Sequence, residues 1–168
     1  MKRESITQSE VKEFLHYDPL TGIFTRKVST GGRYGSAIGS VAGTANDGGY
    51  ILISLKSLQY RAHRLAWLYM TGEWPECEID HKDGDRKNNR WLNLRDVTGQ
   101  VNLQNKRKAQ CNSKTGLLGA SWSTRDKRFV SRIKIDDRYK SLGGFDTAEL
   151  AHAAYLTAKR QLHAGCTI

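Results

Sequence analysis

One polar segment of the chain, residues 79–106, gathers side chains that could together cleave a phosphodiester bond: Asp80, His81, Asn93 and Asn102. Such a cleavage needs an activated water and a counter-charge for the negative oxygens that develop in the transition state. A histidine, whose ordinary pKa is about 6.5, can accept the proton of the water at neutral pH. Carboxylate and amide oxygens suit a hard divalent cation, and magnesium needs few such ligands because it keeps several waters. The segment therefore indicates metal-assisted hydrolysis of a phosphodiester.

The same residue types could serve other metal sites, which the sequence excludes. A calcium loop that starts at Asp83 fails, because its sixth position is Asn88 instead of glycine and its twelfth is Leu94 instead of glutamate. A zinc deaminase needs a Pro-Cys-x-x-Cys run, and a structural zinc site needs paired cysteines; the chain has neither. A polar, turn-rich loop without chemistry is the remaining alternative.

In its order and spacing, the segment resembles the HNH nucleases, and specifically their branch of phage homing endonucleases. In that family a strand ends in Asp-His, a loop with a central Asn leads to a second strand, and a helix carries the last metal ligand. Here Asn93 lies twelve positions after His81, residues 94–97 read as the second strand, and Asn102 lies twenty-one positions after His81. The match in order and in spacing makes the resemblance specific.

The resemblance implies a role for each of these residues. Asp80 and Asn102 would be ligands of one divalent cation, Mg²⁺ or Mn²⁺. His81 would be the general base, and Asn93 would fix the loop and the imidazole. The upstream runs HRLAW and GEWP are similar as well, so the resemblance covers roughly residues 17–105.

The net charge of +10 is unevenly placed along the chain. Residues 1–105 hold 14 Lys and Arg against 12 Asp and Glu, whereas residues 106–168 hold 13 against 5. This asymmetry indicates that the C-terminal third faces a polyanion such as duplex DNA. A membrane is disfavoured as the partner, because the basic residues alternate along strands and no apolar run approaches the roughly 18 residues of a spanning helix. Four more basic residues are phosphate contacts or solvated charges of the polar segment: Lys82, Arg86, Lys87 and Arg90.

The C-terminal third shows the alternation of a strand hairpin. If Asp136-Asp137 is a two-residue turn, Lys134 lies opposite Tyr139. Arg132, Lys134, Tyr139 and Ser141 then share one face of the sheet, opposite a helix over residues 147–163. A cationic face with an aromatic ring suits a phosphate backbone or a groove.

This third of the chain resembles the Apetala-two DNA-binding domain, through GLLGASWSTRDKRFVSRIKI, LGGFDTAE and the later AAY. The resemblance implies a three-stranded antiparallel sheet that enters the major groove, backed by one helix. This sequence departs from the plant pattern, with serines at two first-strand arginine positions and Ser141 at the third-strand tryptophan, so base preference does not transfer. Trp122 is expected to pack inward. The candidate DNA-binding residues are Ser121, Ser123, Arg125, Lys127, Arg128, Arg132, Lys134 and Tyr139.

We expect an α+β protein of four parts. These are a small N-terminal β-rich region (1–60), an HNH ββα-metal core (61–105), a basic linker (106–116) and a C-terminal DNA-binding domain (117–168) in which a three-stranded antiparallel sheet packs on one helix.

Two helices are expected before the polar segment. One covers residues 8–16 with Ser9 as its N-cap, and the other covers residues 61–70. His63, near the start of the second helix, is expected to be a capping or packing histidine.

Together these features predict a metal-dependent DNA endonuclease of the HNH homing type, which hydrolyses duplex DNA to 5′-phosphate and 3′-hydroxyl ends. A non-catalytic, sequence-specific transcription regulator is the alternative, and an RNA-directed nuclease is a third possibility. Three scattered cysteines form no disulfide framework, which favours an intracellular location, in the cytoplasm of a bacterial host. We expect a monomer without a small-molecule cofactor.

Overall fold

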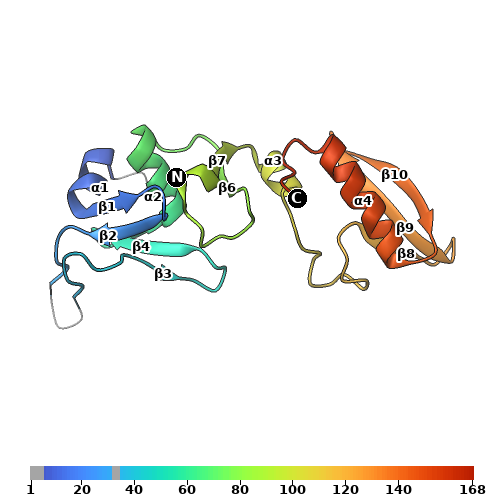
Figure 1. Ribbon diagram of the computed structural model, residues 1–168, viewed down its shortest axis with the longest axis horizontal. Coiled ribbons are helices and arrows are strands. Elements are labelled where there is room, and N and C mark those ends of the chain that lie inside the picture. The colour runs from blue at the N-terminus through green and yellow to red at the C-terminus, as the bar shows by residue number, and fades with distance from the viewer. Residues whose placement is uncertain (1–5, 32–34) are drawn as a thin grey trace. The chain divides into compact units, whose positions relative to one another are not determined.

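The computed structural model describes residues 6–31 and 35–168, and it has the expected α+β class with small antiparallel sheets (Figure 1). Residues 1–5 and 32–34, which belong to the predicted region 1–60, lie outside the described residues. The elements in chain order are α1 (Gln8–Phe14), β1 (Leu15–Asp18), β2 (Ile23–Arg26), β3 (Thr44–Ala45), β4 (Ile51–Leu55), β5 (Leu58–Arg61), α2 (Ala62–Thr71), β6 (Glu78–His81), the 3₁₀ turn η1 (Trp91–Asn93), β7 (Leu94–Val97), α3 (Gly99–Gln104), β8 (Ala120–Ser123), β9 (Arg128–Ile135), β10 (Arg138–Phe145) and α4 (Ala148–Leu162).

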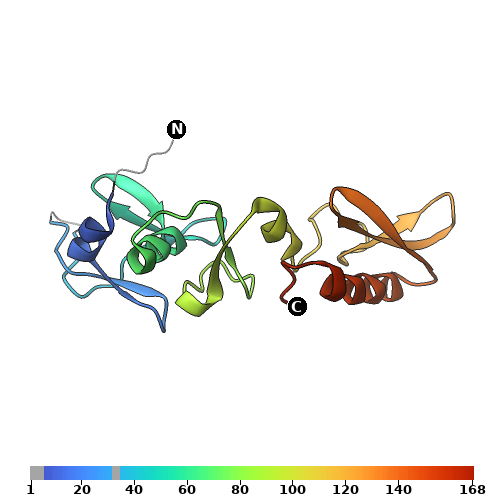
Figure 2. The ribbon, with the colours of Figure 1, turned by 90° about the horizontal axis from the view of Figure 1, so that it is seen from above.

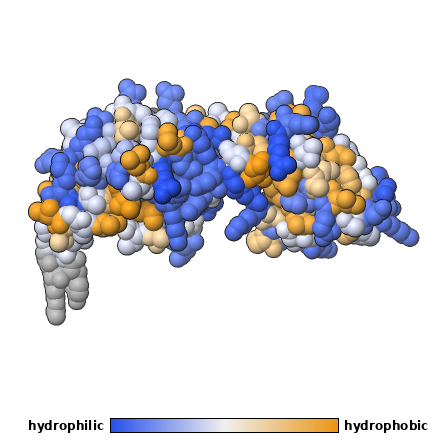
Figure 3. Space-filling view, viewed as in Figure 1, coloured by the Kyte–Doolittle hydropathy of each residue, from blue (hydrophilic) through white to orange (hydrophobic). Residues whose placement is uncertain are grey.

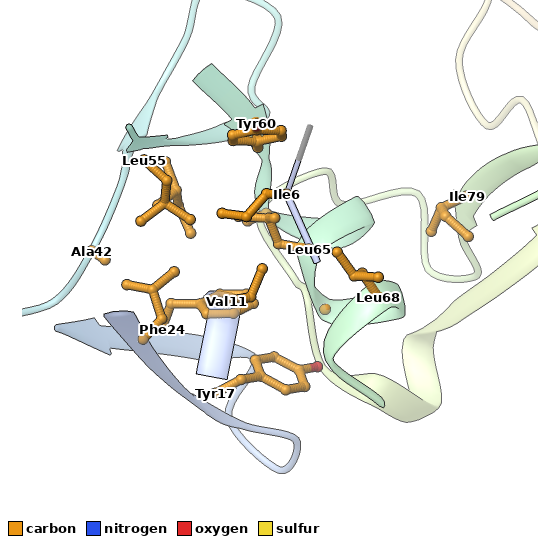
Figure 4. Close-up of a cluster of buried hydrophobic side chains, with 14 of the residues drawn as sticks. Ile6, Val11, Tyr17, Phe24, Ala42, Leu55, Tyr60, Leu65, Leu68 and Ile79 are labelled. Carbon is orange, nitrogen blue, oxygen red and sulfur yellow. The ribbon is translucent and has the colours of Figure 1, made fainter. Parts of the chain in front are cut away.

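The chain forms two compact units, Met1–Thr98 and Gly99–Ile168. In the first unit, side chains from the predicted N-terminal region and from α2, β6 and β7 share one hydrophobic core (Figure 4). The four-part division of the chain stays a prediction. No helix within residues 6–31 and 35–168 is long and apolar enough to span a bilayer.

The core of the first unit lies between α2, the hairpin β1–β2 and the three-stranded sheet β3-β4-β5. Leu65 and Leu68 of α2 are buried, as their helical spacing predicts, and Ile53 of the central strand β4 is buried with them. The fully buried Tyr17 and Phe24 pair across β1 and β2, with ring centroids 4.7 Å apart. Burying a large apolar side chain of this kind contributes about 1.5–3 kcal/mol to the free energy of folding. This core therefore stabilises the positions of β6 and β7, which contribute side chains to it.

Helix α1 begins at Gln8, as predicted, but it has a different N-cap and ends two residues earlier than the predicted residue 16. Its N-cap is Thr7 instead of Ser9: the Thr7 hydroxyl accepts from the Glu10 N–H, while the Glu10 carboxylate accepts from the Thr7 N–H. This reciprocal capping box satisfies two backbone donors that a cap at Ser9 would leave exposed. The helix ends at Phe14 because Leu15 and Tyr17, both buried, point to one face of strand β1.

In the second unit, α4 covers one face of the sheet β10-β9-β8 (Figure 2). Small buried residues of α4, Ala151 and Ala158, permit a close approach to Ser131 and Ile133 of β9, which are also buried. Helix α3 packs on the C-terminal segment of the same unit, where a Cβ on Gly165 would lie 2.1 Å from the Val101 carbonyl oxygen. A larger residue at position 165 would therefore displace α3.

The predicted hairpin is confirmed: Ile135 pairs with Arg138 and Lys134 with Tyr139. Asp136 and Asp137 have φ angles of 44° and 64°, which fit the two-residue turn whose twist matches the strands.

Trp122 lies on the inward side of the sheet, as predicted, but the residue is 49% exposed, so its inward packing is incomplete. It shares a side of the sheet with the buried Ala120, but β8 is an edge strand, so one flank of the indole stays open and Phe129 covers it only edge-on at 5.0 Å.

Candidate active site

The candidate catalytic residues Asp80 and His81 are the last two residues of β6, where the hairpin opens into the loop of residues 82–90. Asp80 is 6% exposed and lies opposite Arg95 of β7. The Asp80 Oδ2 atom accepts hydrogen bonds from Arg95 Nε at 2.9 Å and from Arg95 Nη2 at 2.7 Å. A buried carboxylate is costly without a partner, and Arg95 is such a partner for Asp80.

His81 is 4% exposed, and its Nε2 atom lies 3.3 Å from the Oδ1 atom of Asn89. The Asn89 Nδ2 atom donates to the Lys87 carbonyl at 3.1 Å, which fixes the orientation of the amide and leaves Oδ1 to face the imidazole. An amide oxygen can only accept, so Nε2 donates the proton in this hydrogen bond. Burial lowers the pKa of His81, which keeps the ring in the neutral form that a base requires.

Asn93, the last residue of η1, forms hydrogen bonds with two residues of the loop. Its Oδ1 atom accepts from the Asp83 N–H at 3.0 Å, and its Nδ2 atom donates to Asp83 Oδ1 at 2.9 Å and to the Asn88 carbonyl at 2.7 Å. Asn93 therefore links Asp83 and Asn88 of the loop, and its catalytic role stays a prediction. The amide oxygen that accepts from the His81 imidazole belongs to Asn89. The exposed residues of this loop are hydrophilic, and much of the visible surface of the protein is hydrophilic as well (Figure 3).

Asn89 is a site residue that the sequence analysis missed. It is 2% exposed, and its carbonyl accepts a 2.7 Å hydrogen bond from the buried Tyr17 hydroxyl. The core of the first unit thereby anchors the residue that orients His81. No spacing rule connects positions 17 and 89. A second asparagine beside Asn88 was the only signal in the sequence, and it is weak.

His63 of α2, expected to be a packing or capping residue, packs directly against the candidate base. The rings of His63 and His81 meet edge to face with centroids 5.0 Å apart, and His63 is 3% exposed. Burial, reinforced by the neighbouring His81, lowers the pKa of His63 to about 3. His63 is thus a neutral ring throughout the neutral and mildly acidic range.

The low pKa of His63 predicts that acid destabilises the first unit. The unfolded chain takes up a proton at this histidine below about pH 6.5, whereas the folded chain does so only near pH 3, so stability falls as the pH drops from 6.5 towards 3. Between pH 7 and 4.5 the loss is expected to be about 2–3 kcal/mol of the free energy of unfolding. Urea unfolding at several pH values measures it.

The matched variant for this prediction is His63→Gln, which is similar in size and does not titrate. Its stability should fall less steeply over the same pH range. Parallel pH profiles for the native chain and the variant would show that His63 does not supply the difference.

The donor set suits a hard cation, although few protein ligands are present. Within the described residues, no group of three or more His, Cys, Asp and Glu side chains could hold a metal ion. A cation here would therefore keep several waters, as magnesium does, with the oxygen of a carboxylate such as Asp80 as a ligand. Asn102 lies on α3, in the second unit, and its role as a ligand stays a prediction from the sequence.

The open face of β9 and β10 carries the basic residues expected to contact DNA. Arg132 and Lys134 are exposed, while Ser131 and Ile133, which alternate with them along the strand, are buried, which is the predicted alternation. The guanidinium carbon of Arg132 lies 5.7 Å from the centroid of the Tyr139 ring.

Three of the basic residues expected to contact DNA form ion pairs with surface carboxylates. Lys134 pairs with Asp137 at 2.7 Å, Arg125 with Asp126 at 3.1 Å and Arg128 with Asp146 at 3.2 Å. Exposed pairs of this kind contribute little to stability, so a phosphate can replace the carboxylate at small cost. The remaining candidates are Ser121 and Ser123 on β8 and Lys127 in the turn before β9.

Residues 60–104 match a family model described as HNH endonuclease. The matched range overlaps the segment for which the sequence predicts an HNH core, whose bounds stay a prediction. A solved structure described as "DNA binding and cleavage by the HNH homing endonuclease I-HmuI" is similar with a TM-score of 0.43 and 20% identity, covering 92% of each chain. A comparison with curated proteins finds no match. The family match, and not the structural likeness, assigns the nuclease domain.

Proposed function

We propose that this chain is a metal-dependent endonuclease of the homing type that hydrolyses duplex DNA. The observation that supports the proposal most directly is the environment of the His81 imidazole. A neutral, buried imidazole beside a buried carboxylate has one nitrogen bonded to a fixed amide oxygen, within a segment that matches the HNH endonucleases. A pure DNA binder has no use for this arrangement.

In the proposed mechanism, His81 Nδ1 takes a proton from a water as its oxygen attacks the phosphorus in line. Asn89 keeps the other ring nitrogen protonated, so the imidazole presents its basic side. The bond from phosphorus to the 3′-oxygen breaks, and the leaving 3′-oxygen takes up a proton from solvent, which gives 5′-phosphate and 3′-hydroxyl ends. A divalent cation, Mg²⁺ or Mn²⁺ on Asp80 and Asn102, would supply the counter-charge for the phosphate and the leaving oxygen.

The basic face of the second unit would anchor the chain to DNA as an Apetala-two-like domain. The exposed cations of β9, with Tyr139 beside them, suit contacts to a phosphate backbone. The chain would act as a monomer in the cytoplasm of a bacterial host. One catalytic centre per chain favours nicking of one strand over a double-strand break.

The decisive experiment is cleavage of supercoiled plasmid by the full chain with Mg²⁺, with Mn²⁺ and with a chelator. We expect nicked plasmid with either cation and none with the chelator. Binding of duplex DNA without cleavage under all conditions would contradict the proposal and favour the transcription regulator. Faster cleavage of an RNA of the same sequence would identify an RNA-directed nuclease instead.

A further inference from the structure

Two arginine side chains from different parts of the first unit lie over the ring of Tyr50. The guanidinium carbon of Arg61 lies 4.7 Å from the ring centroid, and that of Arg86 lies 4.8 Å from it. Arg61 is the last residue of β5 and pairs with Leu52 of β4, which makes Tyr50 a diagonal neighbour on the same face of the sheet. Arg86 belongs to the loop between β6 and β7 and donates to the Gly48 carbonyl at 2.8 Å. Two cations from separate segments thus meet at one aromatic ring.

The backbone fixes the position of this ring. Tyr50 closes a turn in which its N–H donates to Asn46 Oδ1 and its carbonyl accepts from the Asn46 N–H, both at 2.9 Å. The ring is half-buried, whereas both arginines are exposed. Tyr50 is therefore a fixed platform under two solvent-facing guanidinium groups.

The two guanidinium groups lie close together, and neither has a carboxylate as an ion-pair partner among the described residues. Each lies under 5 Å from one centroid, so they are within about 10 Å of each other, a distance at which salt screens their repulsion only in part. In the described part of the chain, no carboxylate is within ion-pair distance of Arg61 or Arg86. An arrangement of like charges such as this one is relieved by a bound anion.

The platform is next to the candidate base. The Tyr50 ring lies 5.2 Å from the His63 ring and 6.2 Å from the His81 ring, and the two histidine rings also meet. His63 is neutral and adds no charge here, so Arg61 and Arg86 supply positive charge on the Tyr50 side of His81, while the carboxylates of Asp80, Asp83 and Asp85 supply negative charge near the ring. An anion held by the two arginines would lie on the Tyr50 side of the candidate base.

We propose that Arg61 and Arg86 bind a backbone phosphate of the DNA beside His81, and that Tyr50 is the positioning residue that holds both guanidinium groups in place. The inference rests on the proposed nuclease function and adds to it the residues that receive the substrate. Arginine suits this role because its planar fork of donors matches a phosphate while its face stacks on the ring.

The test compares Arg61→Gln, Arg86→Gln and the double variant with the native chain, for cleavage and for binding of a duplex in the presence of chelator. Near 0.1 M salt, each lost phosphate contact should weaken binding about tenfold and reduce the salt dependence of affinity by about 0.9. Tyr50→Phe, which keeps the ring, should retain both properties, while Tyr50→Leu should behave like the arginine variants. The matched control is Arg64→Gln. In the native chain, the Arg64 guanidinium lies over a different ring, that of Trp74, at 5.5 Å from its centroid.

Separate outcomes address this inference and the function on which it rests. If the native chain binds DNA but cuts none with any cation, the nuclease proposal fails, and the salt dependence still tests the two arginines. If the native chain cuts while the double variant binds and cuts equally well, the phosphate contact is refuted and the function stands. Equal losses in Tyr50→Phe and Tyr50→Leu would refute the positioning role of the ring. A chain that binds no DNA would overturn both.

Discussion

His81→Ala is expected to lower the rate of single-turnover plasmid cleavage by roughly 10²–10⁴-fold, which is the usual contribution of a general base. The ring is neutral, so removing it does not change the number of counter-ions that DNA releases on binding. Affinity for duplex DNA should therefore stay within about twofold of the native value. The loss should therefore fall on the chemical step. Cleavage under saturating enzyme measures the rate, and binding in chelator measures the affinity.

Two controls separate this catalytic effect from a structural one. His16→Ala removes an exposed histidine of β1 and should leave cleavage unchanged. Thermal unfolding of His81→Ala should show whether the first unit still folds, because the removed ring is buried between Asn89 and His63. Equal cleavage by the native chain and by folded His81→Ala would remove His81 from the mechanism.

The sequence predicted most reliably those features that local rules determine. The strand over residues 94–97, the helix of α2 and the hairpin turn at Asp136-Asp137 follow from periodicity and turn chemistry, and the structure has all three. The position of Asp80 and His81 at a strand end was implied by the resemblance to the HNH nucleases, and both residues end β6. The first three features depend only on neighbours in the chain.

The surroundings of His81 could not be predicted in the same way, because they depend on contacts between distant segments. Asn89 is oriented partly by Tyr17, 72 positions away, and the His63 ring reaches His81 only once α2 packs beside β6. Tyr50 joins them from the turn of residues 46–50, which carries no catalytic motif. A spacing pattern records the residues that do chemistry, whereas the tertiary fold decides which side chains tune them.

A triple variant of the C-terminal sheet, Arg125→Gln/Arg132→Gln/Lys134→Gln, should impair binding where His81→Ala impairs chemistry. Three lost phosphate contacts reduce the salt dependence of affinity by about 2.7 and weaken binding roughly 10²–10³-fold near 0.1 M salt. All three side chains are exposed, so the unit should keep its fold. The measurement is duplex affinity of the full chain across a series of salt concentrations.

Cleavage at saturating DNA completes this prediction, because a binding defect disappears once the substrate is bound. The triple variant should then cut at close to the native rate, whereas His81→Ala should stay slow at every DNA concentration. Arg160→Gln is the matched control: its charge lies on α4, the helix that covers the other face of the sheet, and its loss should leave the salt dependence unchanged. If Arg160→Gln weakened binding as much per charge as the triple variant does, the attraction would come from the overall charge of the unit, and the open face of β9 and β10 would have no special part in holding DNA.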